Sequence, residues 1–108
     1  MSKNPPIAEL NDLLRRDFVG GKVLITPGIQ ALGEDAVGAI MAAVRAFSAF
    51  TPDNDPYGEH DCAVMDVGEH RVIWKIDYYD LSMAYGSDDP ANAEATLRLL
   101  TIMLAEEW

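Results

Sequence analysis

The sequence is poor in cysteine and has no long hydrophobic run. Its single cysteine, Cys62, excludes a disulfide within the chain, which fits a reducing compartment. The N-terminal stretch MSKNPPIAEL lacks the continuous apolar segment of a signal peptide. The longest apolar stretches, residues 37–44 and 97–105, are too short to cross a membrane. These absences predict a cytoplasmic protein.

Basic residues are scarce, and the shortage is confined to one half of the chain. The net charge is −10, from 18 acids and 8 bases. Residues 1–50 carry five of each, whereas residues 51–108 carry thirteen acids against Arg71, Lys75 and Arg98. A surface of this sign disfavours direct binding to nucleic acid or to an anionic membrane. It favours a basic protein partner.

What is present predicts one domain over residues 1–108, since 49% hydrophobic residues suffice for a core without metals or disulfides. A first helix should begin at Asn4-Pro5-Pro6 and end at Gly20-Gly21, because apolar residues from Ile7 to Phe18 recur at helical spacing. Residues 22–26 are rich in β-branched side chains and lie between Gly20-Gly21 and Pro27-Gly28, which favours a strand. A second helix should run from Glu34 to Phe50, before Pro52.

Residues 62–78 predict a β-hairpin. Gly68-Glu69 has the glycine-first pattern of a type II′ turn. The register that this turn imposes sets Asp66 opposite Arg71 and apolar residues opposite apolar residues. It also puts Tyr78 on the core side and leaves Tyr79 exposed.

A last helix is expected after a loop over residues 80–89. Asp89 suits its N-cap and Pro90 its first turn, and Leu97, Leu100, Met103 and Leu104 supply a helical stripe. The element order is then α-β-α-β-β-α. The predicted fold is a single acidic α+β domain, with a small three-stranded antiparallel or mixed sheet packed by helices.

The loop before the hairpin invites two metal hypotheses. Asp53, Asp55 and Gly58 match an EF-hand loop, but Val64 stands where the bidentate Glu belongs, so an Asx-turn loop is the better interpretation. The second hypothesis is a metal-binding or hydrolytic site. Its candidate ligands are Glu59, His60, Asp61, Asp77 and Asp80. The competing interpretation is a structural, hydrogen-bonded His60.

Other catalytic signatures are missing from the sequence. There is no serine-based triad, glycine-rich phosphate loop, zinc pattern or nucleic-acid-binding motif. Cys62 has no histidine beside it in sequence and is expected to act as a small buried or half-buried hydrophobe. No cofactor is expected.

Several motifs together resemble the DUF3768 family. They are the string from Phe50 to Asp61, Trp74 to Asp80, Tyr85-Gly86-Ser87 with Asp89-Pro90, and Leu100 to Ala105. The resemblance extends from about Leu10 to Trp108, although Cys62 stands where an aromatic residue is expected. It implies a small bacterial protein, typical of alphaproteobacteria and often encoded on plasmids or other mobile elements. The family carries no established activity, so the resemblance assigns no functional residue.

Charge and resemblance together favour a non-enzymatic acidic domain that binds a protein with a basic, nucleic-acid-binding surface. The sharpest form of this hypothesis is a mobile-element-borne inhibitor of the anti-CRISPR or another anti-defence type, acting by mimicry of DNA charge. The candidate contact residues are Asp53, Asp55, Glu59, Asp80, Asp88 and Tyr79. The alternatives are the metal-binding or hydrolytic protein described above and an accessory protein of plasmid maintenance. Self-association stays open.

Overall fold

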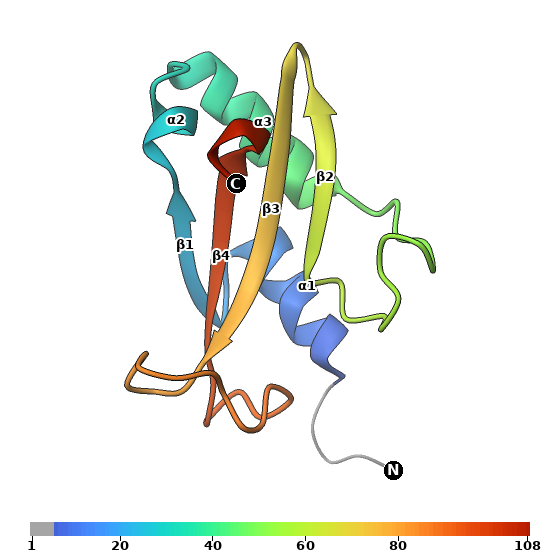
Figure 1. Cartoon of the computed structure of the whole chain (residues 1–108), viewed down its shortest axis with the longest axis vertical. Helices are drawn as coiled ribbons and strands as arrows, with labels where there is room; N and C mark the ends of the chain where they lie inside the picture. The colour runs from blue at the N-terminus through green and yellow to red at the C-terminus, as the bar shows by residue number, and fades with distance from the viewer. Residues whose placement is uncertain (1–5) are drawn as a thin grey trace.

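A four-stranded mixed sheet organises the chain, in the order β1-β4-β3-β2 (Figure 1). The computed structural model describes residues 6–108. The strands are β1 (Gly21–Ile25), β2 (Cys62–Val67), β3 (His70–Tyr79) and β4 (Leu97–Leu104). β1 runs parallel to β4, and the other neighbours are antiparallel. The α+β class is therefore confirmed, with a sheet larger than the three strands predicted.

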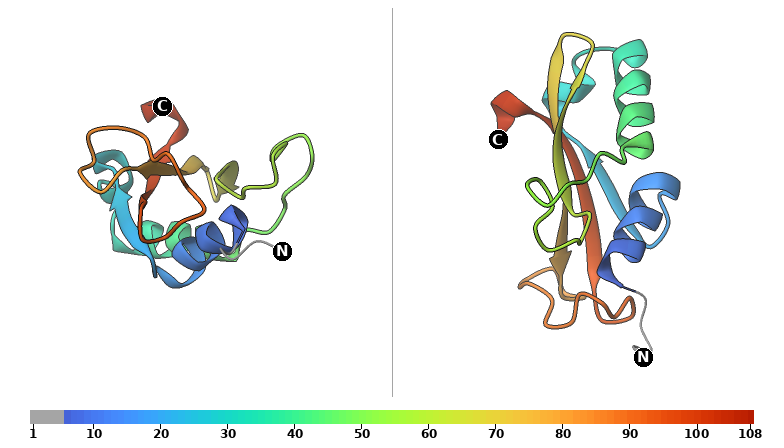
Figure 2. Two further views of the ribbon diagram at one scale, coloured as in Figure 1. Left: turned by 90° about the horizontal axis from the view of Figure 1, so that it is seen from below. Right: turned by 90° about the vertical axis from the view of Figure 1, so that its right-hand side faces the viewer.

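The two longer helices, α1 (Ile7–Asp17) and α3 (Glu34–Ala46), lie on one face of this sheet. The short α2 (Pro27–Gln30) follows β1, and a 3₁₀ turn, η1 (Ala105–Glu107), follows β4. Figure 2 (right) shows α1 and α3 on one side of the sheet and the end of the chain on the other. Within residues 6–108, no helix combines the length and the apolar character that a membrane crossing needs.

The core fills the space between these helices and the sheet. Leu14 of α1 and Ile40 and Val44 of α3 are fully buried, as are Trp74 of β3 and Ile102 of β4. Burying one such aliphatic side chain contributes about 1.5–3 kcal/mol, so the apolar stripes of the two helices hold them on the sheet. α1 ends at Asp17, earlier than predicted, because Phe18 takes a left-handed conformation with φ 56°. Asn4 and Pro5, predicted to begin this helix, lie outside the described residues.

The hairpin has the predicted turn and register. Val67 pairs with His70, Asp66 with Arg71 and Ala63 with Trp74. Gly68 has φ 60°, the sign that the first position of a type II′ turn requires. Arg71 Nε donates to Asp66 Oδ1 at 3.1 Å, so the charge pair predicted beside the turn is present.

The predicted last helix is wrong, because residues 97–104 form the strand β4. This strand pairs with β1 on one side and with β3 on the other. A central strand covered on both faces has a continuous apolar run, and such a run also contains residues at helical spacing. Asp89 is therefore no N-cap. It lies in the irregular segment before β4, where its carbonyl accepts a bond from Thr96 Oγ1 at 2.8 Å.

Two further boundaries differ from the prediction. The segment 27–30 forms α2, which supplies the buried Ile29, and this helix was not predicted. α3 stops at Ala46 instead of Phe50. The extended chain after it inserts Phe47 and Phe50 against Trp74, with ring centroids 5.9 and 6.1 Å apart. The gain from packing two aromatic rings explains the early end of the helix.

Candidate functional site

Two loops, residues 51–61 and 80–96, concentrate negative charge. We call them the acidic loops. They carry eight acids and no lysine or arginine: Asp53, Asp55, Glu59, Asp61, Asp80, Asp88, Asp89 and Glu94. In Figure 1, loop 80–96 lies at the bottom, below β3 and β4, and loop 51–61 stands out to the right of β2; the view from below (Figure 2, left) shows it on the same side. They contain all the acidic residues that the sequence proposed as partner contacts.

The bases of the second half do not neutralise these loops. Arg98 is only 2% exposed, on the core side of β4. Lys75 Nζ lies 2.8 Å from Asp77 Oδ2, and Arg71 Nε lies 3.1 Å from Asp66 Oδ1. Arg71 and Lys75 are thus paired outside the acidic loops, and the buried Arg98 acts on Glu59 alone among the loop acids, so these bases leave most of the charge of the acidic loops uncompensated.

His60 anchors loop 51–61 to α1. Its Nδ1 lies 3.0 Å from Asp12 Oδ1, and its Nε2 lies 3.6 Å from Asp55 Oδ2. Its ring stacks on Phe50 with centroids 4.0 Å apart and planes 2° from parallel. The backbone at His60 is left-handed, with φ 54°, and its N–H donates to Asp55 Oδ1 at 3.2 Å. These contacts give His60 a structural role in shaping the loop.

Arg15 holds Asp12, the residue that contacts His60, in place. Its guanidinium is fully buried and donates to Asp12 Oδ1 at 2.9 Å. It also donates to the carbonyls of Val44 and Phe47, at 3.0 and 2.8 Å, just where α3 ends. Burial lowers the pKa of Arg15, and the bond to Asp12 opposes this shift. Asp12 therefore links the buried arginine to His60.

The carboxylates of Asp55, Glu59 and Asp61 lie close to one another at the end of loop 51–61, beside Asp77 of β3. Burial raises the pKa of Glu59, and the Asp61 and Asp55 carboxylates raise it further. Burial likewise raises the pKa of Asp61, helped by Asp55 and Asp77. The ionised form of both carboxylates is therefore disfavoured, first by burial and then by the neighbouring negative charges.

A network of hydrogen bonds around the buried Asn11 joins loop 51–61 to the strands β3 and β4. Asn11 Nδ2 donates to Tyr78 Oη at 2.8 Å and to the Glu59 carbonyl at 3.0 Å. Its Oδ1 accepts from Arg98 Nε at 3.0 Å. Burial raises the pKa of Tyr78 to about 12, so its hydroxyl stays protonated. The side chain of Asn11 thereby connects α1, loop 51–61, β3 and β4.

The loop 80–96 begins with a preformed turn. Asp80 Oδ1 accepts from Ser82 Oγ at 2.7 Å and from the Ala84 amide at 3.2 Å. The Ser82 hydroxyl, with the backbone amides, lowers the pKa of Asp80. Asp88, Asp89 and Glu94 are exposed farther along. Asp80 is thus a charged group with fixed geometry, and the other three are freely accessible.

The predicted contact residues differ in accessibility. Asp53 and Asp88 are exposed, Glu59 and Asp80 are partly exposed, and Asp55 is 9% exposed and turned toward His60. Tyr79 is half-buried. The most exposed aromatic residues of the acidic loops are instead Tyr57 (87%) and Tyr85 (76%). Sequence reasoning passed over these two tyrosines, although their position in loops was a signal of exposure.

The candidate metal ligands do not assemble into one site. Among the described residues, no group of three His, Cys, Asp or Glu side chains is placed to hold a metal ion. His60 is held by Asp12 and Asp55, Asp77 pairs with Lys75, and Asp80 bonds to Ser82. Asp12 and Arg15, which complete the His60 network, are 48 and 45 positions away in sequence, so no local motif marked them.

Cys62 is exposed, which corrects its expected role as a buried or half-buried hydrophobe. It lies at the start of the edge strand β2, on the side away from the core residue Ala63. Partial burial and the nearby Asp61 and Asp55 carboxylates raise the pKa of its thiol. Cys62 is therefore not an activated nucleophile.

Comparison with known proteins identifies the family and nothing beyond it. The model of the family described as "Protein of unknown function (DUF3768)" matches residues 25–107, which include both acidic loops and the whole sheet except the first residues of β1. No curated protein and no solved structure matches the chain. The match covers most of the sequence and agrees with the resemblance seen in the motifs, so this chain belongs to the DUF3768 family.

Proposed function

We propose that this protein is a non-enzymatic protein-binding domain whose acidic loops hold a basic, nucleic-acid-binding surface of another protein. The observation that carries the proposal is the excess of negative charge on these loops. They hold eight acids without a lysine or arginine, while Arg71 and Lys75 are paired outside them and Arg98 is buried. Charge of one sign attracts the opposite surface over about a Debye length, ~8 Å at physiological salt. It thereby raises the association rate and selects the partner.

Two features of the loops suit them to binding. Tyr57 and Tyr85 are large, exposed side chains among the acids, and tyrosine is enriched among the residues that dominate interface energies. The backbone around the acids is held by His60 in one loop and by Asp80 in the other. A loop ordered before binding loses less conformational entropy when the partner arrives.

The sharpest form of the proposal is an inhibitor of a host defence system, of the anti-CRISPR or another anti-defence type. Such a protein would present carboxylates where its target expects DNA phosphates. The family's association with mobile elements, implied by the resemblance, supports this form. The acidic loops support only the broader proposal of a basic partner.

The test compares two variants that remove equal charge. The loop variant carries Asp53→Asn, Asp88→Asn, Asp89→Asn and Glu94→Gln. The control variant carries Glu9→Gln, Asp17→Asn, Glu69→Gln and Glu106→Gln, which are exposed acids outside the acidic loops. Each protein is used for affinity capture from cells with active CRISPR or restriction systems, at low and at high salt.

We expect the wild type and the control variant to retain a nucleic-acid-binding protein at low salt and to release it at high salt. The loop variant should lose this capture, because surface substitutions of this kind change stability by only about ±0.5 kcal/mol each. Competing DNA should displace the captured protein. Capture that is insensitive to salt, or that both variants lose equally, would contradict the proposal.

A further inference from the structure

The sheet has a free edge along β2. In the sheet order β1-β4-β3-β2, this strand has a neighbour on one side only. In an antiparallel pair, the backbone N–H and C=O groups of alternate residues point to the neighbouring strand, and those of the residues between them point away from it. The Asp61 carbonyl accepts from the Ile76 amide of β3 at 2.7 Å, so the odd-numbered residues of β2 face β3. The backbone groups of Cys62, Val64 and Asp66 therefore point outward.

The part of the chain that the structure describes offers no strand and no other backbone group to these outward groups. All three residues are exposed. Natural proteins protect such an edge with a lysine, a proline or a bulge. β2 has the sequence CAVMDV and pairs with β3 without interruption, and its one charged residue, Asp66, is paired with Arg71. The other edge strand, β1, does carry a lysine, Lys22. The edge of β2 is thus open to pairing with an added strand.

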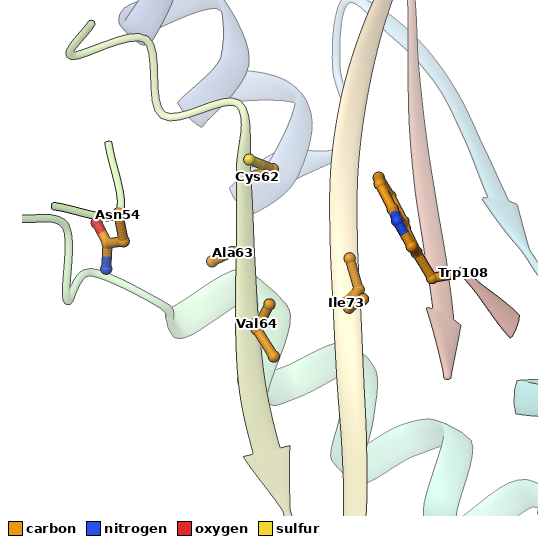
Figure 3. A pocket seen from close by; sticks show the side chains of 6 residues that line it. All are labelled: Asn54, Cys62, Ala63, Val64, Ile73 and Trp108. Atoms are coloured by element: carbon orange, nitrogen blue, oxygen red, sulfur yellow. The ribbon is translucent and has the colours of Figure 1, made fainter. Parts of the chain in front are cut away.

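A groove of about 430 Å³ lies over this edge strand. It is lined by Asn54, Cys62, Ala63, Val64, Ile73 and Trp108. Figure 3 shows Asn54 on the outer side of β2, and Ile73 and Trp108 on its inner side. An added strand places every second side chain on each face of the sheet. Apolar side chains at alternate positions of such a strand would therefore fit this groove, whose lining is apolar except for Asn54.

The chain that forms and flanks this edge is negative. Residues 46–70, which include loop 51–61, β2 and the hairpin turn, carry six acids and no lysine or arginine. Asp53 is exposed, and its neighbour Asn54 lines the groove. In Figure 1, loop 51–61 stands out on the side of β2 that is away from β1. The charge therefore favours a basic segment at this edge and repels an acidic one.

We propose that the basic partner binds by strand addition, in which an extended segment of that partner pairs with the free edge of β2. The outward backbone groups supply main-chain hydrogen bonds, the groove takes apolar side chains at alternate positions, and loop 51–61 attracts the lysines or arginines between them. This inference rests on the proposed function for the charge of the partner, and it adds how the partner is held. A second copy of this chain fits the edge less well, because it would bring another segment without bases to the same place.

The first test uses the full chain and synthetic peptides that alternate lysine with valine or threonine. One peptide is unmodified, one carries N-methyl groups on its lysine amides, and one carries them on the other amides, so all three have the same charge. Only one set of amides can face β2, so we expect one methylated peptide to bind at least about tenfold more weakly than the other. Calorimetric titration measures the affinities. Equal binding of the two methylated peptides, or no binding of any peptide, overturns strand addition.

Amide hydrogen exchange followed by NMR locates the contact. Without peptide, the amides of Cys62, Val64 and Asp66 should exchange quickly, whereas those of Ala63 and Met65 are bonded to β3 and should exchange slowly. The unmodified peptide, at about ten times its dissociation constant, should slow exchange at the first three amides roughly tenfold. Protection of these amides that appears with rising protein concentration and no peptide would place a second copy at the edge and overturn the proposal.

Val64→Pro tests the edge in the whole protein. The substitution removes one outward N–H and no bond to β3, and proline is tolerated on an edge strand where the N–H faces outward. Val64→Thr is the matched control, because it keeps the N–H and the β-branched shape. In the capture experiment above, Val64→Pro should lose the partner and Val64→Thr should retain it. Circular dichroism checks folding, and the methylated peptides decide the test if Val64→Pro does not fold.

The two proposals fail in different ways. Capture that the loop variant loses but Val64→Pro retains would overturn strand addition and leave the proposed function standing. Capture that Val64→Pro loses but the loop variant retains would support the role of the β2 edge and contradict the proposed function.

Discussion

Single side chains, rather than a continuous apolar layer, hold the acidic loops in place. Arg15 is the clearest case, because it is fully buried yet makes bonds to α3, to the segment after it and to Asp12. Its guanidinium also lies 5.4 Å from the Phe50 ring and 5.2 Å from the Trp74 ring. A buried cation with this many partners is destabilising to remove, because its acceptors are left without donors.

Substitution of Arg15 by methionine should lower the free energy of unfolding by about 2–4 kcal/mol. The carbonyls of Val44 and Phe47 lose their donor, and Asp12 keeps only His60. Arg16→Met is the matched control, since the side chain of Arg16 is exposed and its loss should cost within about 0.5 kcal/mol. The measurement is the urea midpoint of each variant. Equal losses for the two arginines would show that Arg15 is not a structural centre.

At the scale of elements, η1 is tied to the start of α2 by one carboxylate. Glu107 Oε1 accepts from Thr26 Oγ1 at 2.7 Å and from the Leu104 amide at 2.8 Å, and its Oε2 accepts from the Gly28 amide at 3.1 Å. The Leu104 amide is the largest cause of the lowered pKa of Glu107. This contact orients η1 and therefore the exposed Trp108 that follows it.

Gly28→Ala should break this tie. A Cβ at position 28 would lie 2.5 Å from the Cδ and Oε1 atoms of Glu107, so the carboxylate must swing away. We expect a lower urea midpoint in the wild-type background, because the hydrogen bonds of the Glu107 carboxylate to Thr26 and Gly28 are lost. In a Glu107→Ala background the same substitution should cost almost nothing, which a double-mutant cycle measures by urea unfolding.

Gly38→Ala serves as the control for this cycle. Gly38 lies within α3, and nothing approaches within 4 Å of the Cβ that the substitution adds. Replacing a glycine in a helix interior by alanine should stabilise the protein by about 0.5–1 kcal/mol. Additive losses from Gly28→Ala and Glu107→Ala would mean that the contact does not couple the two elements.

The elements also show where sequence patterns are ambiguous. The hairpin was predicted with its register, because turn chemistry and alternation act between neighbouring strands. The run Leu97–Leu104 was predicted as a helix and forms the strand β4 instead. Its apolar residues cover both faces, and periodicity cannot distinguish a buried strand from a buried helix in so short a run. α2 was missed because four residues are too few to carry a periodic pattern.

At the scale of the whole molecule, repulsion among the acids is an unfavourable electrostatic contribution to folding. Glu59 and Asp61 already have raised pKa values, partly because neighbouring carboxylates oppose their ionisation. A net charge of −10 on a chain of this size destabilises the compact state through self-repulsion. This repulsion is concentrated where the acidic loops meet the sheet.

The melting temperature should therefore rise with added salt. We expect an increase of several degrees between low salt and physiological salt, because screening weakens repulsion over distances near the Debye length. The loop variant described above should melt higher at low salt and depend less on salt than the control variant, since its four neutralised acids lie close together. Thermal unfolding followed by circular dichroism measures both effects. A melting temperature that falls with salt would show that attractive ion pairs dominate instead.

The sequence by itself determined the features that depend on near neighbours. These are the α+β class, the first helix, the hairpin with its register, the acidic second half and membership of the DUF3768 family. Each follows from turn residues, alternation or composition, which act over a few positions of the chain.

Only the tertiary structure decided the contacts between distant segments. Asp12 meets His60 across 48 positions, and Asn11 meets Arg98 across 87. The same long-range packing places β4 between β1 and β3 and buries Asp55. The physical reason is that a local pattern states which residues avoid water, whereas the arrangement of all elements decides which surface covers them.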